Sequence, residues 1–262
     1  MEKLHIIKIG GNVIDDPVLL NKFLKDFAAI PSHKILVHGG GKLATSLANR
    51  LGIEQTMIDG RRVTDARTLD VTVMVYAGLI NKNLAAGLQA LACNAFGICG
   101  ADGDLIRSTK RKHAETDFGF VGDVSAQSVN AGQFEKLLNA GITPVVSAIT
   151  HNGEGALLNT NADSVAQVIA LALKERFDVK LTYCFEKKGV LQNVDDEDSF
   201  IPVLTKRSYD YLKASGVISK GMIPKLDNAF DAMAQGITQL VICHANSIHH
   251  SEDIKGTQLA LT

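Results

Sequence analysis

The segments LHIIKIGG at residues 4–11 and KILVHGGG at residues 34–41 decide the fold of this 262-residue chain. Each is a short apolar run that ends in consecutive glycines, which is typical of a buried strand that leads into a tight loop. Residues 18–30, between them, carry apolar side chains at helical spacing. Asp16-Pro17 supplies a helix cap and a proline at the first helical position. The chain therefore opens with a β–α–β unit.

The alternation of strands and helices continues along the rest of the chain. Helices are predicted over residues 65–91, 130–140, 162–173, 205–214 and 223–235, and strands over residues 96–99, 142–149, 180–185 and 238–243. Strands that alternate with helices form a largely parallel sheet covered on both faces. We therefore predict an α/β protein, a three-layer αβα sandwich with a largely parallel central sheet.

Two stretches interrupt this alternation. Residues 105–124 alternate weakly in polarity, which predicts a β-hairpin or flap, and residues 191–203 predict a second hairpin with acidic residues at its tip. We place a soft boundary near residues 149–155. Residues 1–150 would then form an N-terminal lobe and residues 151–262 a C-terminal lobe, both on one continuous sheet.

Composition argues against several classes of protein. The 27 basic and 28 acidic side chains leave a net charge of −1, which lacks the basic excess that binding many nucleic-acid phosphates requires. Apolar runs such as residues 165–173 are shorter than the roughly 20 residues of a membrane span. Four cysteines without a CxxC pair predict free thiols in a reducing compartment. We expect a cytoplasmic protein that binds neither nucleic acid nor membranes.

The two glycine clusters predict an anion site. Consecutive glycines between a strand and a helix leave backbone N–H groups free to surround an anion. Their spacing matches neither the Walker A motif nor the dinucleotide-binding G-x-G-x-x-G motif. Tight turns alone would explain either cluster. Two clusters at the carboxyl ends of successive strands favour a ligand site, because ligands of open α/β sheets bind at that edge.

Two later helix starts add charged side chains. In NTNAD at residues 159–163, Asn161 could serve only as an N-cap, and Asp163 could merely complement the helix dipole. Lys225 lies in the first turn of another helix, where a cation is electrostatically unfavourable, so we expect it to have an anionic partner. Lys8, Lys225 and Asp163 could therefore converge on a phosphate.

Together these motifs resemble those of the amino acid kinase family. The resemblance rests on Lys8-x-Gly10-Gly11, His38-Gly39-Gly40-Gly41, Gly60-Arg61-Arg62-Val63-Thr64, Asn159 to Asp163, GMIPK at residues 221–225 and Gly256-Thr257, in the family's order. It implies an ATP-dependent kinase that phosphorylates the γ-carboxylate of N-acetyl-L-glutamate, the second step of arginine biosynthesis. It also implies that the N-terminal lobe binds the acylated amino acid and forms a homodimer, while the C-terminal lobe binds ATP.

The resemblance also implies a role for each matching residue. Lys8 and Lys225 would stabilise the transferring phosphoryl group, with Asp163 orienting both lysines. Substrate would be bound by Gly40, Gly41, Arg62 and Asn159, with Arg62 on the α-carboxylate. The nucleotide would contact Gly10, Gly11, Glu186, Gly189, Gly221 and Met222. Mg²⁺ would be held mainly by the ATP phosphates and not by a protein metal site.

The chemistry accounts for these residue types. A glutamate γ-carboxylate has a reference pKa of about 4.3, so at pH 7 it is already an anionic nucleophile and needs no general base. Charge repulsion is the obstacle, since two like unit charges ~4 Å apart repel by about 4 kcal/mol at an effective dielectric of 20. Lysines, Mg²⁺ and backbone amides offset that repulsion. Asp163 as a proton acceptor and His38 as a general acid are therefore disfavoured, and His38 is expected only to position its loop.

Some positions leave alternatives open. Glu186 stands where the family commonly has aspartate, and Lys220 where glycine or aspartate is usual. Arg61 is either a surface arginine or a ligand for a second carboxylate, which would make the acyl group succinyl instead of acetyl. The rival functions are another small-acid kinase of this fold, acting on glutamate, aspartate or carbamate, and a catalytically silent ligand-binding regulatory module.

Overall fold

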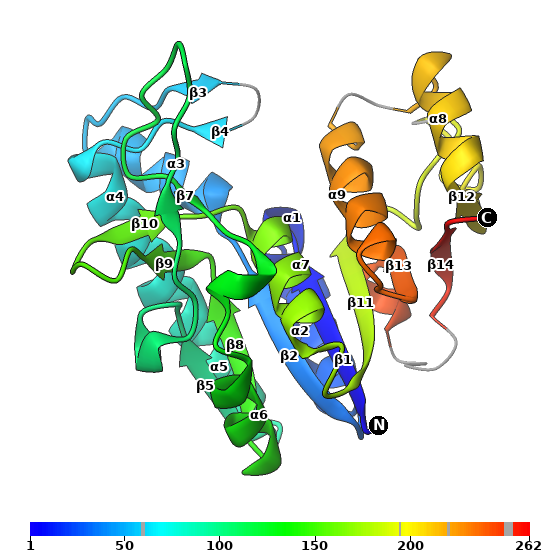
Figure 1. Ribbon diagram of the computed structural model, residues 1–262, viewed down its shortest axis with the longest axis horizontal. Coiled ribbons are helices and arrows are strands. Elements are labelled where there is room, and N and C mark those ends of the chain that lie inside the picture. The colour runs from blue at the N-terminus through cyan, green and yellow to red at the C-terminus, as the bar shows by residue number, and fades with distance from the viewer. Residues whose placement is uncertain (59–60, 194, 219–220, 249–253) are drawn as a thin grey trace.

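A computed structural model describes residues 1–58, 61–193, 195–218, 221–248 and 254–262. An eight-stranded sheet runs through its centre in the order β12-β14-β13-β11-β1-β2-β8-β5 (Figure 1). These strands are β1 (Lys3–Ile9), β2 (His33–His38), β5 (Ala95–Ile98), β8 (Thr143–Ser147), β11 (Asp178–Phe185), β12 (Val203–Thr205), β13 (Gln239–His244) and β14 (Gly256–Ala260). Every neighbouring pair of strands is parallel apart from β13 and β14.

Helices cover both faces of this sheet, as predicted. On one face α2 (Pro17–Ala28) packs against α5 (Asn81–Gln89), which contacts β5 and β8. On the other face α7 (Ala162–Leu173) lies between α6 (Ala131–Asn139) and α9 (Ile223–Ala234) and contacts β1 and β11 (Figure 1). The three-layer αβα sandwich predicted from the sequence is confirmed.

The remaining elements surround the carboxyl ends of the strands or lie at the edge of the sheet. The helices are α1 (Gly11–Ile14), α3 (Gly41–Arg50), α4 (Ala66–Val73) and α8 (Lys206–Ala214), with short 3₁₀ turns at Asp102–Asp104, Ala126–Ser128 and Ala245–Ser247. The short strands are β3 (Met57–Ile58), β4 (Arg61–Arg62), β6 (Thr109–Lys110), β7 (Gly122–Asp123), β9 (Ile149–His151) and β10 (Leu157–Asn159). β6 pairs with β7 in antiparallel fashion, so residues 105–124 do form the predicted hairpin flap.

The two halves of the chain meet at the centre of the sheet. β1 pairs in parallel with β2 on one side and with β11 on the other, from Lys3 opposite Asp178 to Ile9 opposite Cys184. The strands β2, β5 and β8, from residues 33–147, therefore lie on one side of β1, and the strands β11 to β14, from residues 178–260, lie on the other (Figure 1). The division into a substrate lobe and a nucleotide lobe near residues 149–155 stays a prediction.

The segment predicted as one strand over residues 142–149 is two strands. β8 ends at Ser147, and the chain leaves the central sheet to form β9, which pairs in antiparallel fashion with β10. Residues 143–150 are buried without interruption, apolar and polar alike, so burial does not mark the break. The prediction was wrong because the pattern of buried residues is the same in a central strand and in a short hairpin packed over it.

The long helix predicted over residues 65–91 contains an unexpected turn. α4 and α5 are joined by a π-helical segment, Met74–Ile80, so the helical chain is continuous from Ala66 to Gln89. By length and composition this helix could cross a membrane, a test that core helices of soluble proteins also pass. Its buried side chains include Val71, Val75 and Leu84, and they face the protein core.

Candidate active site

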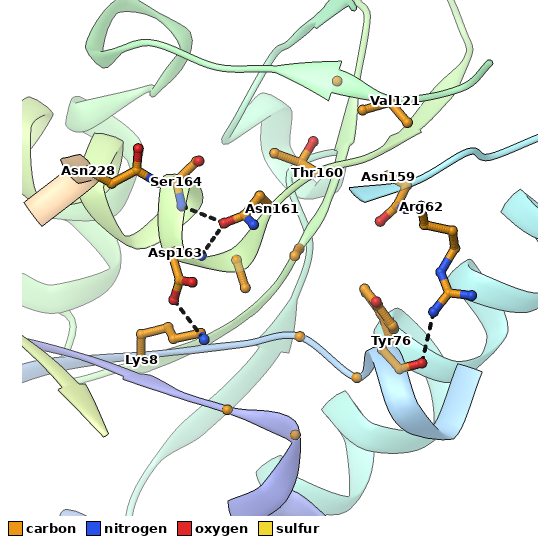
Figure 2. A pocket seen from close by; sticks show the side chains of 18 of the residues that line it. Lys8, Arg62, Tyr76, Val121, Asn159, Thr160, Asn161, Asp163, Ser164 and Asn228 are labelled. Carbon is orange, nitrogen blue, oxygen red and sulfur yellow. Dashed lines mark hydrogen bonds and ion pairs between the residues drawn. The ribbon is translucent and has the colours of Figure 1, made fainter. Parts of the chain in front are cut away.

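A cavity of about 290 Å³ opens at the carboxyl ends of β1 and β2. Its walls are both glycine loops, the first turn of α7, the side chains of Arg62 and Tyr76, and the β6–β7 flap. Figure 2 shows the Lys8–Asp163 pair on one side of the cavity and Arg62, Tyr76 and Asn159 on the other. The arrangement offers cationic groups at two separate ends of one small chamber.

Lys8 and Asp163 form a buried ion pair at one end of this cavity. Lys8 is the penultimate residue of β1, and its Nζ lies 2.7 Å from Asp163 Oδ1 (Figure 2). The side chain of Asn161 caps α7 by accepting hydrogen bonds from the N–H groups of Asp163 (2.8 Å) and Ser164 (3.1 Å). The N-cap interpretation of Asn161 is thus confirmed, and the cap fixes the turn that carries Asp163.

Lys225 lies beside this pair and shares an aromatic neighbour with Lys8. The Nζ atoms of Lys225 and Lys8 lie 3.9 Å and 5.3 Å from the centroid of the Phe185 ring. Burial lowers the pKa of Lys225, while the nearby carboxylate of Asp163 acts in the opposite direction. Two ammonium groups around one carboxylate leave a positive charge in partly desolvated surroundings, which favours an anionic ligand.

Arg62 forms the second cationic end of the cavity. Its Nη2 donates hydrogen bonds to the carbonyl oxygen of Gly41 (2.9 Å) and to Thr45 Oγ1 (2.7 Å), and Nη1 donates to Gln55 Oε1. The hydroxyl of Tyr76 also bonds to this guanidinium, although burial still raises the pKa of Tyr76 overall. The Arg62 side chain is therefore held in place before any ligand arrives.

Asn159 and the triple glycine complete the wall between the two ends. The side chain of Asn159 donates to Thr64 Oγ1 at 3.0 Å, and its residue faces the cavity. A Cβ atom on Gly40 would lie 2.4 Å from Ile80 Cδ1 and 2.9 Å from Tyr76 Cδ1, so a side chain there would displace the helix side chains behind it. Glycine at this position lets the backbone pack directly on the π-helical segment.

Not every predicted nucleotide residue reaches this cavity. Gly10 and Gly11 line it, whereas Glu186, Gly189, Gly221 and Met222 do not. Glu186 is exposed and accepts a hydrogen bond from Asn12, and Gly189 packs closely on Thr257. The roles of these four residues stay predictions. Gly60 and Lys220 lie outside the described residues, as does the side chain of Arg61.

Several residues that line the cavity were not predicted from the sequence. Tyr76 lies in the helix predicted over residues 65–91, which was not expected to reach the site, and Arg111 lies in the flap, whose position over the site was not predicted. Arg111 pairs with Asp123 and lies 5.6 Å from the centroid of the Phe118 ring. In the sequence, only the basic residues next to Arg111 indicated that this segment could bind an anion. Nothing in the sequence indicated that Asn228 or Ser164 would line the cavity.

The described residues do not gather a protein-built metal site. No group of three or more His, Cys, Asp or Glu side chains that could hold a metal ion occurs among them. Asp163 is the carboxylate that lines the cavity, and it is already paired with Lys8. With so few protein ligands, the cavity suits an Mg²⁺ ion that is bound to nucleotide phosphates and keeps most of its water ligands, as Mg²⁺ commonly does.

Comparisons with known proteins agree with this geometry. The sequence model of the amino acid kinase family matches residues 3–244. This chain belongs to the amino acid kinase family. It is 54% identical over 249 residues to an acetylglutamate kinase of Cytophaga hutchinsonii, covering 95% of this chain and 94% of the relative. It is 51% identical to an acetylglutamate kinase of Bacteroides thetaiotaomicron, with 98% of each chain covered.

One solved structure is similar to this chain over the whole fold. The crystal structure of smu.665 from Streptococcus mutans superposes with a TM-score of 0.81 at 25% identity, covering 99% of both chains. The two chains therefore share one overall fold along nearly their whole length.

Proposed function

We propose that this kinase transfers the γ-phosphoryl group of ATP to the γ-carboxylate of N-acetyl-L-glutamate and releases an acyl phosphate and ADP. The observation that carries the proposal is one cavity lined by Lys8 and Asp163 at one end and by Arg62 at the other. Lys225 is not among the lining residues, but its Nζ lies at the same Phe185 ring as that of Lys8. A dicarboxylic substrate could place its γ-carboxylate toward the lysines and its α-carboxylate on Arg62. The identity of more than 50% to two acetylglutamate kinases supports this substrate.

The proposed reaction needs charge compensation and no proton transfer. The γ-carboxylate attacks the γ-phosphorus as an anion, and the leaving ADP takes the electron pair of the broken bond. Lys8 and Lys225 would stabilise the negative charge on the transferring oxygens. Asp163 is already bound to the Lys8 ammonium at 2.7 Å, so we assign it to holding the lysines and not to accepting a proton.

The nucleotide and metal assignments rest on chemistry and family membership. ATP is the proposed phosphoryl donor, and the loop amides of Gly10, Gly11, Gly40 and Gly41 would donate hydrogen bonds to its phosphates and to the substrate. Mg²⁺, bound through the ATP phosphates, would supply further neutralisation of their charge. We propose a cytoplasmic location, where ATP is available, and cell fractionation would test it.

The first experiment measures ADP release from ATP with a panel of acceptors. N-acetyl-L-glutamate should give a far higher kcat/KM than free glutamate, aspartate or carbamate, because the acyl amide has a partner in Asn159 and the α-carboxylate one in Arg62. Activity should disappear when EDTA removes Mg²⁺. No turnover with any acceptor would favour the rival silent module, and turnover only with an unacylated acid would replace the proposed substrate.

N-succinyl-L-glutamate belongs in the same panel. Arg61 motivates this alternative, and Arg111 brings a further cation to the cavity wall. Arg111 is already engaged by the carboxylate of Asp123, which favours the neutral acetyl group at that position. A higher kcat/KM for the succinyl compound would assign the dicarboxylic acyl group instead.

We also propose that the chain forms a homodimer through the long helix α4–α5. Met74 and Leu79 of the π-helical segment are 53% and 52% exposed, and Phe96 of edge strand β5 is 52% exposed. Exposed apolar side chains of this size commonly mark an interface. Light scattering should give twice the chain mass of 28.1 kDa. The variant Leu79→Glu should shift the mass toward that of one chain, and a monomeric parent protein would contradict the proposal.

A further inference from the structure

Two fully buried polar side chains, His38 and Asn81, lie directly behind the triple-glycine loop. Both are 0% exposed. His38 is the last residue of β2, and its Nδ1 lies 2.9 Å from the carbonyl oxygen of Gly39. Asn81 begins α5, and its Nδ2 lies 3.0 Å from His38 Nε2. The pair therefore links the long helix to the first peptide of the loop.

The backbone around Asn81 determines which atoms carry the protons. Asn81 Nδ2 also lies 2.8 Å from the carbonyl oxygen of Val145 and 3.3 Å from that of Ile98. Carbonyl oxygens only accept, so this atom must be the amide nitrogen, which only donates. His38 Nε2 is consequently an acceptor without a proton, and the ring proton is on Nδ1. Nδ1–H then donates to the Gly39 carbonyl.

His38 is neutral at physiological pH. Burial is the largest of the causes that together lower the pKa of His38 to about 4; the hydrogen bond to Gly39 acts in the opposite direction, and the charge of Lys82 acts in the same direction as burial. A neutral ring has one N–H donor, and the Asn81 contact leaves that donor facing Gly39. The hydrogen bond to the loop is therefore fixed in direction as well as in position.

The direction of the Gly39 carbonyl decides the direction of the next amide. In a trans peptide the C=O of Gly39 and the N–H of Gly40 point to opposite sides of one plane. A carbonyl held toward His38 therefore turns the Gly40 N–H away from the protein interior. The following carbonyl, that of Gly40, accepts from Ala44 N–H at 3.0 Å in the first turn of α3, which orients the Gly41 N–H in the same way.

The π-helical segment supplies the other contacts of this loop. It carries Tyr76 and Ile80 against Gly40 and ends next to Asn81. On the far side, Asn81 is accommodated by Gly97, where a Cβ atom would lie 2.4 Å from Asn81 Oδ1. The π-helical segment thus places Tyr76 and Ile80 against Gly40, and Asn81, the next residue, against His38. Such π-bulges occur frequently at functional sites.

We propose that His38 and Asn81 are positioning residues of the kinase, which hold the Gly39 peptide so that the Gly40 N–H is aimed at the transferring phosphoryl group. The inference rests on the proposed function, because the loop matters only if an anion binds there. Donors that are fixed before the reaction stabilise a transition state better than donors that must reorient.

The test compares two substitutions of His38, each of which keeps a polar group at the position of a different ring nitrogen. The amide nitrogen of His38→Asn can occupy the position of Nδ1 and donate to Gly39. The longer His38→Gln instead reaches the position of Nε2 and loses the bond to the loop. Positioning through the Gly39 peptide predicts that kcat falls ~10-fold or more in His38→Gln and stays within ~3-fold in His38→Asn. KM for the acyl acceptor should change less than kcat.

The matched control is His5, a buried histidine on the neighbouring strand β1 whose Nε2 bonds to Thr182 Oγ1 at 2.8 Å. His5→Gln should lower the melting temperature and leave kcat unchanged. Equal kcat in both His38 variants, or a higher kcat in His38→Gln, would overturn the proposal. Absence of kinase activity in the parent protein would instead overturn the proposed function.

A spectroscopic measurement on the parent protein avoids dependence on variants that fail to fold. Nitrogen-15 NMR of the histidine rings distinguishes the two neutral tautomers. We expect His38 to carry its proton on Nδ1 at pH 7, and a proton on Nε2 would overturn the inference because the Gly39 carbonyl would then have no donor from the ring.

Discussion

Lys8→Ala should lower kcat ~100-fold or more and leave the protein folded. The Lys8 ammonium is fixed by Asp163 at 2.7 Å and lies at the wall where the phosphoryl group would transfer. Removing one preorganised donor of this kind reduces turnover by ~10²- to 10³-fold in other enzymes. The substitution also leaves Asp163 without its partner, adding a buried carboxylate that repels the anionic substrates. Steady-state kinetics with N-acetyl-L-glutamate and ATP measures the loss.

Lys34→Ala is the control for removing a buried lysine. The Nζ of Lys34 donates to the carbonyl oxygens of Ala28 (2.7 Å) and Ile30 (2.6 Å) at the end of α2, far from the cavity. This variant should be less stable to heat than the parent protein at an unchanged kcat. A Lys8→Ala enzyme that keeps kcat within ~3-fold of the parent would show that Lys8 does not act on the transition state.

Arg62→Ala should act on substrate binding, raising KM for N-acetyl-L-glutamate ~100-fold. The guanidinium is held by Gly41, Thr45 and Gln55, so it is positioned for a carboxylate without further ordering. Removing one partner of a buried charged pair costs about 3 kcal/mol, which is a factor of about 100 in affinity. KM for ATP should stay within ~3-fold, because the nucleotide is assigned to the other end of the site.

Arg62→Lys separates the effect of charge from that of geometry. Lysine keeps the charge and loses the planar guanidinium that Gly41, Thr45 and Gln55 hold in place, so its KM should lie between those of the parent and the alanine variant. Arg107→Ala removes an exposed arginine paired with Asp104 and should change neither constant. An Arg62→Ala enzyme with normal KM and reduced kcat would move Arg62 from substrate binding to catalysis.

The parts of the fold that the sequence predicted are those with local causes. β1 and β2 were recognised because buried β-branched runs ended in glycine, and α7 was predicted with the bounds that the structure shows. Asp16 caps α2 by accepting from the N–H groups of Val18 and Leu19, as the Asp-Pro pair predicted. Each of these features depends on residues within one turn or one strand.

The features that escaped prediction depend on distant partners. β14 joins the sheet between β12 and β13, and its five residues carry no signal stronger than their neighbours. The π-helical turn is absent from the sequence pattern, because one extra residue in a helix barely changes a spacing of three and four. Asn81 looked like an ordinary helical residue, and its role depends on carbonyls 17 and 64 residues away along the chain.

The residues of the candidate site fall into the same two groups: those predicted from local motifs and those brought to the site by distant segments. Lys8, Gly40, Gly41, Arg62, Asn159 and Asp163 line one cavity, as their shared motif pattern led us to expect. Tyr76 and Arg111 reach it only because the long helix and the flap fold over the strand ends. Glu186, Gly189, Gly221 and Met222 lie apart from it, so their assignment to the nucleotide still rests on the family resemblance.

The position of β14 fixes the order in which the sheet can be completed during synthesis. β12 contacts the central sheet through β14 among the described residues, although β12 leaves the ribosome some fifty residues earlier. It must therefore wait, unpaired, until residues 256–260 have emerged. The same late strand brings Thr257, whose hydroxyl accepts from Val190 N–H at 2.8 Å and so ties down the loop after β11. A nascent chain can thus assemble the half that carries Arg62 well before the half that carries Lys225 is closed.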